Sequence, residues 1–165
     1  MAIFPTGYNP IASAAGANRV YADDGTTNGT LTLTAIAAYM GTLGVTSSSP
    51  TAGVGYAAGA GGTVTQATSK STGVTLNKIA GQITTSNALL AGSSSVGFTL
   101  TNSAIAATDV VNTSIASGAS ADSYRIGVDA TAAGSCRISI RNVTTATALS
   151  EAIVINFAVM KSVAA

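Results

Sequence analysis

The sequence predicts a mostly-β fold, an antiparallel β-sandwich or jelly-roll-like barrel that follows an extended N-terminal arm. From residue 63 onward, apolar and polar residues alternate with a period of two, which is typical of strands that bury one face. Before residue 63, Gly, Pro and small residues interrupt the chain at short intervals, which is typical of an extended segment with turns. The 165 residues therefore predict an arm over 1–62 and a sandwich domain over 63–165.

The arm contains one segment with a helical pattern, residues 31–40. Its apolar residues recur at helical spacing: Leu33, Ile36, Ala37 and Met40. We therefore expect one short helix there, although residues 31–36 also alternate as a strand would, and that alternative stays open.

Residues 59–62 are three glycines and one alanine. We interpret them as a flexible linker rather than a phosphate-binding loop, because no Lys-Ser/Thr pair follows them.

Four segments of the domain alternate strongly and predict its main strands. Their expected core residues are Val96, Phe98 and Leu100; Tyr124, Ile126, Val128 and Ala130; Cys136, Ile138 and Ile140; and Ile153, Ile155, Phe157 and Val159. Weaker strand patterns lie at 63–68, 73–76, 79–85 and 110–115. Seven or eight short strands in about 100 residues are typical of a sandwich or a barrel.

Residues 132–134 predict a tight hairpin between two of the strong strands. A three-residue loop with Gly134 at its last position fits a type I turn followed by a bulge. That register pairs Thr131 with Ser135 and keeps Ala130 on the apolar core face.

The same register makes predictions about the charged residues of the hairpin. It places Asp129 opposite Arg137, which is favourable, and Arg125 opposite Arg141, which is unfavourable unless an acidic group intervenes. An acidic partner, for example a neighbouring subunit, is one possible source of that group. We therefore name Arg125, Arg137 and Arg141 as candidate partner-contact residues, with a solvated outer face as the alternative.

The last strand is apolar on both faces. Val154, Ala158 and Met160 alternate with its core residues and would face away from the core. A strand that is apolar on both faces is buried on both. We therefore expect this strand to be central in the fold or packed in a subunit interface, and we name Val154 and Met160 as further candidate partner-contact residues.

Composition argues against an enzyme and against a nucleic-acid-binding protein. Only 8% of the residues are charged, against about 25% in an ordinary soluble domain, and the net charge is +1. The chain has no His, which excludes Ser-His-Asp and Cys-His catalysis and any His-ligated metal. The single Glu excludes a pair of glutamates, so a catalytic carboxylate pair would have to include Asp, for example a pair among Asp109, Asp122 and Asp129. We therefore expect no catalytic residue, no cofactor and no metal.

Cys136 and the oxygen-rich residues 23–29 have ordinary structural interpretations. Cys136 lies on the apolar face of a strand, so we expect a buried thiol rather than a nucleophile. Residues 23–29 are rich in oxygen ligands but lack the downstream Glu of a calcium loop, which favours a turn. No run of 18 apolar residues predicts a transmembrane helix, and the N-terminus does not resemble a secretory signal.

Six segments of the domain carry a resemblance to a known class of proteins. They are GGTVTQ at 61–66, SKSTGVTLNK at 69–78, GQIT at 81–84, FTLTNS at 98–103, ISIRNV at 138–143 and SEAIVINFAVMK at 150–161. Together they resemble head or tail structural proteins of tailed bacteriophages and prophages. The resemblance covers about residues 61–161 and includes no catalytic motif.

This resemblance implies an accessory virion protein. The function that it favours is capsid decoration: a homotrimeric cement protein on the capsid exterior that binds and stabilises the lattice of the major capsid protein. It implies synthesis in the host cytoplasm and no binding to nucleic acid or membrane. The alternative is a tail or fibre-associated β module involved in assembly or host-receptor binding. A tail-spike glycan hydrolase is the third and least favoured reading.

Overall fold

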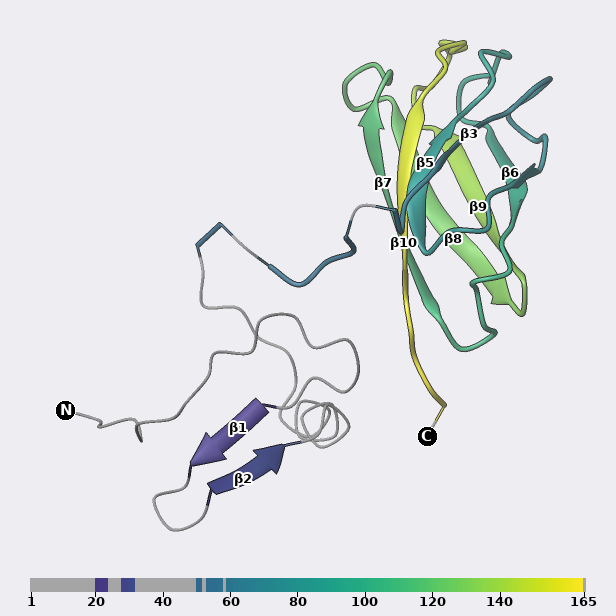
Figure 1. The fold of residues 1–165 in the computed structure, drawn as a ribbon. Coiled ribbons are helices and arrows are strands. Elements are labelled where there is room, and N and C mark those ends of the chain that lie inside the picture. Colours follow the sequence, from purple (N-terminus) through teal and green to yellow (C-terminus); the bar gives the residue numbers. More distant parts are fainter. Residues whose placement is uncertain (1–19, 24–27, 32–49, 52, 58, 165) are drawn as a thin grey trace. The chain divides into compact units, whose positions relative to one another are not determined.

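The computed structural model describes residues 20–23, 28–31, 50–51, 53–57 and 59–164 (Figure 1). The chain divides into two units, residues 1–55 and 56–165. In the first unit, β1 (Val20–Asp23) and β2 (Asn28–Leu31) pair antiparallel, a hairpin that the sequence patterns did not predict. The segment expected to be a helix lies outside the described residues, apart from Leu31 at the end of β2. Residues 24–27 of the oxygen-rich segment also lie outside them.

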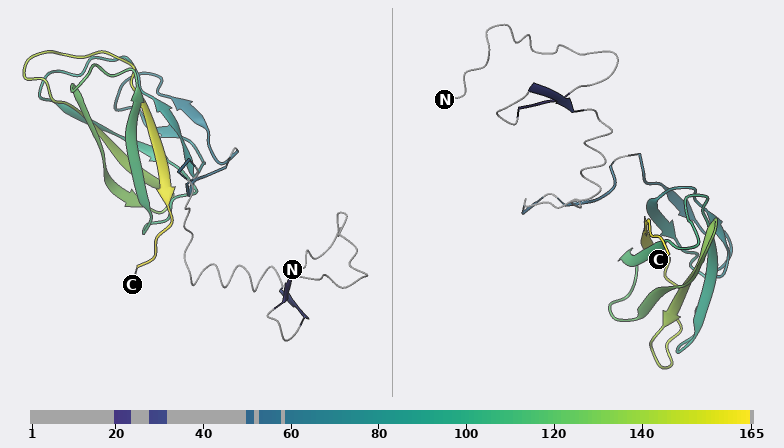
Figure 2. Two further views of the ribbon diagram at one scale, coloured as in Figure 1. Left: turned by 90° about the vertical axis from the view of Figure 1, so that its left-hand side faces the viewer. Right: turned by 90° about the horizontal axis from the view of Figure 1, so that it is seen from below.

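The second unit is the predicted mostly-β sandwich (Figures 1 and 2). One sheet has the strand order β3 (Thr63–Thr65), β5 (Ala80–Thr84), β10 (Val154–Met160) and β7 (Val110–Ser117); we call it the β10 sheet. The other has the order β4 (Val74–Thr75), β6 (Ser95–Thr101), β9 (Ser135–Asn142) and β8 (Tyr124–Ala132); we call it the β9 sheet. All eight predicted strand segments are therefore confirmed. The described part of the chain contains no helix of the length and apolarity that crossing a bilayer requires.

Both sheets are mixed, whereas the sequence patterns predicted antiparallel pairing. β3 pairs parallel with β5 and β4 pairs parallel with β6, while the remaining pairs are antiparallel. The reason is the path of the chain, which alternates between the two sheets from β3 to β8. Between β3 and β5 the chain crosses to the opposite sheet and back, which reverses its direction twice. Strands two apart along the chain therefore run in the same direction, and they pair parallel where they become neighbours.

The core lies between the two sheets and is filled by alternate residues of their strands. The largest apolar side chains that are almost fully buried are Ile83, Phe98, Leu100, Ile138, Ile140, Ile153, Ile155 and Val159. Seven of these eight are expected core residues of the four strongly alternating segments, and the eighth, Ile83, comes from β5. Burial of each such side chain contributes about 1.5–3 kcal/mol, so the alternation that identifies the strands also supplies the main stabilising interaction.

The turn of the β8–β9 hairpin differs from the prediction. Ala132, not Thr131, pairs with Ser135, so the loop has two residues instead of three. Ala130 is consequently exposed rather than in the core. The turn still depends on Gly134, whose φ of 79° lies in the left-handed region that favours glycine.

Residues before β3, which we expected to belong to the arm, make hydrogen bonds to the sandwich. The Tyr56 hydroxyl donates to the carbonyl of Val159. Nζ of Lys78 donates to the carbonyl of Gly59 at 3.2 Å, and the N–H of Gln82 donates to the carbonyl of Gly62 at 2.9 Å. The described part of residues 56–62 is therefore anchored along the domain rather than forming a free linker.

Candidate interaction faces

The five candidate contact residues lie on the outer faces of the two sheets. Arg125 of β8 and Arg137 and Arg141 of β9 occupy outward positions of the β9 sheet, and we call this surface the arginine face. Val154 and Met160 occupy outward positions of β10, and we call the outer surface of the β10 sheet the uncharged face. The structure thus separates the five residues into two groups. That they contact a partner stays a prediction.

Strand pairing arranges the arginine face in rows that run from β6 across β9 to β8. Three neighbouring rows are Ser95–Arg141–Arg125, Gly97–Ser139–Gly127, and Thr99–Arg137 with Asp129 beside it. Asp129 is the extra residue of a bulge in β8, which restores the predicted register beyond the turn. Because of this bulge, Arg125 and Arg141 lie directly opposite each other, as predicted.

Arg137 is held in place on this face. Its Nε lies 3.4 Å from Oδ2 of Asp129, so the expected ion pair forms, although the register places Ala130 and not Asp129 opposite Arg137. The hydroxyl of Ser139 donates to the other carboxylate oxygen of Asp129 at 2.8 Å. A Cβ atom on Gly97 would lie 2.4 Å from Nη2 of Arg137, so the guanidinium rests directly over that glycine. An exposed ion pair of this kind contributes about 0.2–1 kcal/mol.

Arg125 and Arg141 lack such a counter-charge. Both are exposed, and Nη1 of Arg125 donates to the carbonyl of Tyr124 at 3.0 Å. Within the described ranges, neither guanidinium forms an ion pair. Like charges directly opposite each other on two strands are destabilising. The face therefore carries an unneutralised positive pair next to a neutralised arginine.

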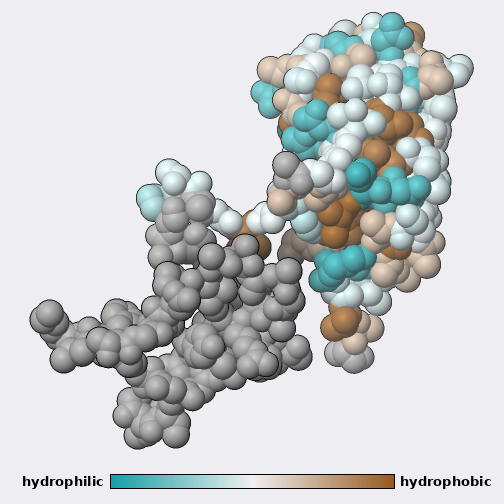
Figure 3. Space-filling model, in the orientation of Figure 1, coloured by the Kyte–Doolittle hydropathy of each residue, from teal (hydrophilic) through white to brown (hydrophobic). Residues whose placement is uncertain are grey.

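The uncharged face has a different chemistry. The outward positions of its four strands hold only apolar, hydroxyl and amide side chains: Thr63, Thr65, Ala80, Gln82, Thr84, Val110, Asn112, Ser114, Ala116, Val154, Asn156, Ala158 and Met160. Figure 3 shows one side of this unit, where small, separate hydrophilic patches lie among pale and apolar side chains. A surface of this type neither attracts nor repels a charged partner.

The centre of the uncharged face is β10, which lies between β5 and β7. This confirms that the last strand is central in the fold. Nε2 of Gln82 donates to Oδ1 of Asn156 at 3.0 Å, which ties β5 to β10 on the outside. A shallow hollow of about 170 Å³ lies between β7 and β10 beside Asn112, Ser114 and Ala158. Met160, at the end of β10, keeps 58% of its surface exposed.

A buried lysine, which the sequence analysis did not identify, organises one end of the sandwich. Lys70 is only 3% exposed, and its Nζ donates to the carbonyls of Ser86 at 2.6 Å and Glu151 at 2.7 Å. Gln66, also buried, accepts a hydrogen bond from the N–H of Ser86 and donates to the carbonyl of Lys70. Burial lowers the pKa of Lys70, and the nearby charge of Glu151 partly opposes this shift. The contacts join three loops, so the lysine acts as a structural cross-link.

The Glu151 side chain continues this network. Its carboxylate accepts hydrogen bonds from the hydroxyls of Ser120 and, at 2.8 Å, Tyr124. The Ser120 hydroxyl is the largest cause of the lowered pKa of Glu151. Burial, and then the carboxylate, raise the pKa of Tyr124, which keeps its phenol protonated as the donor. Every partner here is a protein group, and the arrangement holds the loop before β8 against the segment before β10.

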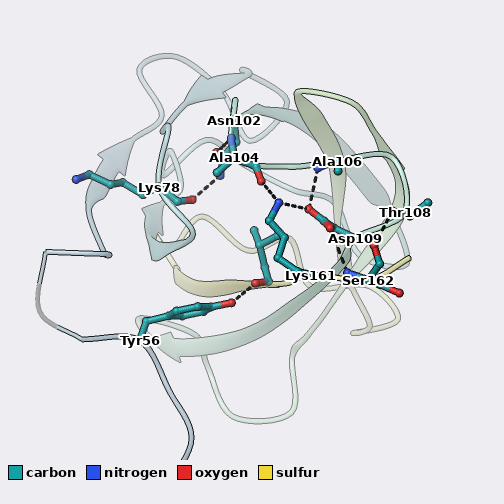
Figure 4. Close-up of polar contacts among 10 residues, drawn as sticks. Tyr56, Lys78, Asn102, Ala104, Ala106, Thr108, Asp109, Lys161 and Ser162 are labelled. Atoms are coloured by element: carbon teal, nitrogen blue, oxygen red, sulfur yellow. Dashed lines mark hydrogen bonds and ion pairs between the residues drawn. The ribbon is translucent and has the colours of Figure 1, made fainter. Parts of the chain in front are cut away.

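A second polar cluster fixes the C-terminal end of β10 (Figure 4). The side chain of Asp109 is 1% exposed, and Nζ of Lys161 lies 2.6 Å from its Oδ2. The same carboxylate accepts hydrogen bonds from the N–H groups of Ala106 at 2.7 Å and Ser162 at 3.3 Å. Those contacts, the Ala106 N–H most strongly, lower the pKa of Asp109. The cluster ties the loop before β7 to the residues after β10.

The three aspartates considered for catalysis have separate environments. Asp109 is bound by Lys161, Asp129 by Arg137 and Ser139, and Asp122 lies in the loop before β8 with a φ of 57°. Cys136 is 2% exposed in the core, and burial raises its pKa to about 11. The part of the chain that the structure describes contains no cluster of three potential metal ligands. It also leaves no buried side-chain nitrogen or oxygen without a hydrogen-bond partner.

Comparison with known proteins adds no relative. No protein-family model, no curated protein and no solved structure matches the chain.

Proposed function

We propose that this chain is a structural protein of a tailed-phage particle, which decorates the capsid exterior and stabilises it by binding the lattice of the major capsid protein. The segments between residues 61 and 161 that resemble virion proteins support this proposal. The observation that carries it is the contrast between the two outer faces of one small sandwich. One face has unneutralised arginines, and the other has no charged side chain.

Two unlike faces suit a module that is held between two kinds of neighbour. The arginine face has three positive and one negative side chains, a net charge of 3 − 1 = +2, and favours an acidic surface, which the proposal expects on the capsid shell. The uncharged face can pack against a different uncharged surface of a neighbouring copy without like-charge repulsion, and such head-to-tail contacts are the kind that close a homotrimer. A protein that binds only the assembled lattice stabilises it by mass action.

The dense internal hydrogen bonding supports the same proposal. Lys70 and Asp109 cross-link loops at the ends of the strands, so the surfaces presented to neighbours are pre-organised. A pre-organised surface loses less conformational entropy when it binds, and more of the contact energy then appears as affinity.

Location in the particle tests the proposal. Cryo-electron microscopy of purified virions should show this sandwich at regular lattice positions on the outside of the head. Particles that lack the protein should rupture at a lower temperature than complete ones, and adding the purified protein back should restore their stability. Density confined to the tail would overturn the proposal in favour of a tail or fibre-associated module.

A further inference from the structure

The arginine face contains a positive pair that the fold itself does not neutralise. Arg125 and Arg141 are directly opposite each other across β8 and β9, and within the described residues no carboxylate forms an ion pair with either. Arg137 on the same face, by contrast, has Asp129 beside it. The face therefore shows one satisfied guanidinium and two that lack an acidic partner.

The neighbouring row gives access to this pair. Between the Arg125–Arg141 row and the Arg137 row lie Gly97, Ser139 and Gly127, so the only outward side chain in that row is a serine. A Cβ atom on Gly127 would have Ser139 Oγ as its nearest neighbour, at 3.8 Å, so the space above this glycine is open. Arg137 already covers Gly97. A partner's side chain can therefore reach the sheet next to the two arginines at the Gly127 end of the row.

From this arrangement we infer that Arg125 and Arg141, with the open position at Gly127, form a docking site for a carboxylate of an acidic protein segment. Two arginines opposite each other on neighbouring strands can bring their guanidinium groups to the two oxygens of one carboxylate and bind it through charge-assisted hydrogen bonds. A single carboxylate between them also removes their mutual repulsion. Identifying the acidic partner as the major capsid protein rests on the proposed function, whereas the site itself does not.

A nucleic-acid phosphate is the competing ligand, and the structure favours the carboxylate. The unneutralised positive charge is confined to one row of the face, whereas nucleic-acid surfaces extend their positive charge along the backbone of the ligand. The row beside the arginines offers glycine and serine, and no aromatic side chain on which a base could stack.

Binding of the full-length chain to a labelled hexaglutamate peptide at low salt, measured by fluorescence anisotropy, tests the site. We expect Arg125→Gln and Arg141→Gln each to weaken binding by about fivefold, and the double variant by more than about tenfold. Lys78→Gln, which removes the same charge from an exposed residue that is not among those of the arginine face, should stay within about twofold. Gly127→Val should also weaken binding, because it fills the open position without changing the charge.

Thermal unfolding gives a readout that needs no ligand. Arg141→Gln relieves the like-charge pair and should raise the melting temperature by about 1–3 °C, whereas Arg137→Gln loses the ion pair with Asp129 and should lower it by a similar amount. If Arg125 and Arg141 form a binding site that costs the free protein stability, the two substitutions should change the melting temperature in opposite directions. If Arg141→Gln lowers the melting temperature as Arg137→Gln does, the inference is wrong.

The remaining outcomes are also decisive. Undetectable peptide binding at low salt, or equal losses in Lys78→Gln and the arginine variants, would overturn the inference. Tighter binding to a single-stranded oligonucleotide of equal charge would overturn it in favour of nucleic acid. If the peptide results hold but the protein is absent from capsids, the proposed function fails while the carboxylate site stands. If the protein is on capsids but does not bind the peptide, the carboxylate site fails while the proposed function stands.

Discussion

Replacing the buried Lys70 by Met should destabilise the sandwich. The methionine side chain has a similar length but no donor, so the carbonyls of Ser86 and Glu151 lose the hydrogen bonds at 2.6 and 2.7 Å. Each polar group left unsatisfied in a buried site costs about 1–3 kcal/mol. Removing the ammonium also relieves its desolvation, which offsets part of that loss. We therefore expect the free energy of unfolding to fall by about 2 kcal/mol at neutral pH.

The effect should grow with pH. Because burial lowers the pKa of Lys70 below its ordinary value of 10.5, the unfolded chain binds more protons at this site than the folded chain between the two values. The contribution of Lys70 to the free energy of unfolding therefore rises with pH in that window. The Lys70→Met variant lacks this contribution, so the difference between the two proteins widens as the pH approaches 10.5. Groups that titrate in both proteins, such as Tyr124 and Cys136, cancel in the difference.

Urea denaturation at several pH values measures both the loss of stability in Lys70→Met and its dependence on pH. The chain has five Tyr and no Trp, so far-ultraviolet circular dichroism and tyrosine fluorescence are the suitable signals. Lys78→Met is the matched control, because Lys78 is exposed and loses only a solvent-exposed hydrogen bond to Gly59, so its stability should change by less than about 0.5 kcal/mol. A Lys70→Met variant as stable as Lys78→Met, or a difference that narrows as the pH rises, would refute the structural role of Lys70.

Three further predictions concern other parts of the sandwich. Gly81→Ala should lower the free energy of unfolding, measured by urea denaturation, by about 1–3 kcal/mol, because the new Cβ would lie 2.5 Å from the carbonyl of Gly62. An unchanged urea midpoint would contradict this packing. Burial raises the pKa of Cys136 from 9.0 to about 11, so the protein should lose stability as the pH rises between these values. Cys136→Ala should lose less over the same range, and equal slopes would rule out this origin. Because the pKa of Asp109 is lower in the folded protein than its ordinary value of 3.8, the Asp109 carboxylate stabilises the fold above pH 3.8, and this stabilisation is lost as the pH falls through the pKa of the folded protein. Asp109→Asn should therefore lose less stability in acid when unfolding is followed by circular dichroism. An acid transition that is the same in both proteins would exclude this role of Asp109.

Local pattern was sufficient to find every strand of the sandwich and to place the candidate contact residues on its outer faces. Alternation identifies a strand because successive side chains point to opposite faces, and this depends only on neighbouring residues. The same rule placed Val154 and Met160 on the outside of β10, and the short hairpin placed Arg125 opposite Arg141. That pairing holds although the predicted loop was one residue too long, because the bulge at Asp129, which the sequence did not predict, restores the register.

Tertiary structure alone decided which strands became neighbours and where buried polar groups found partners. The parallel pairs follow from the path of the chain between two sheets, which no single strand encodes. Lys70 meets Glu151 across 81 residues of sequence, and Asp109 meets Lys161 across 52. In sequence each is an isolated charge that a solvated surface would explain equally well. Only the packed core shows that such a charge is buried, because burial depends on residues that are distant along the chain.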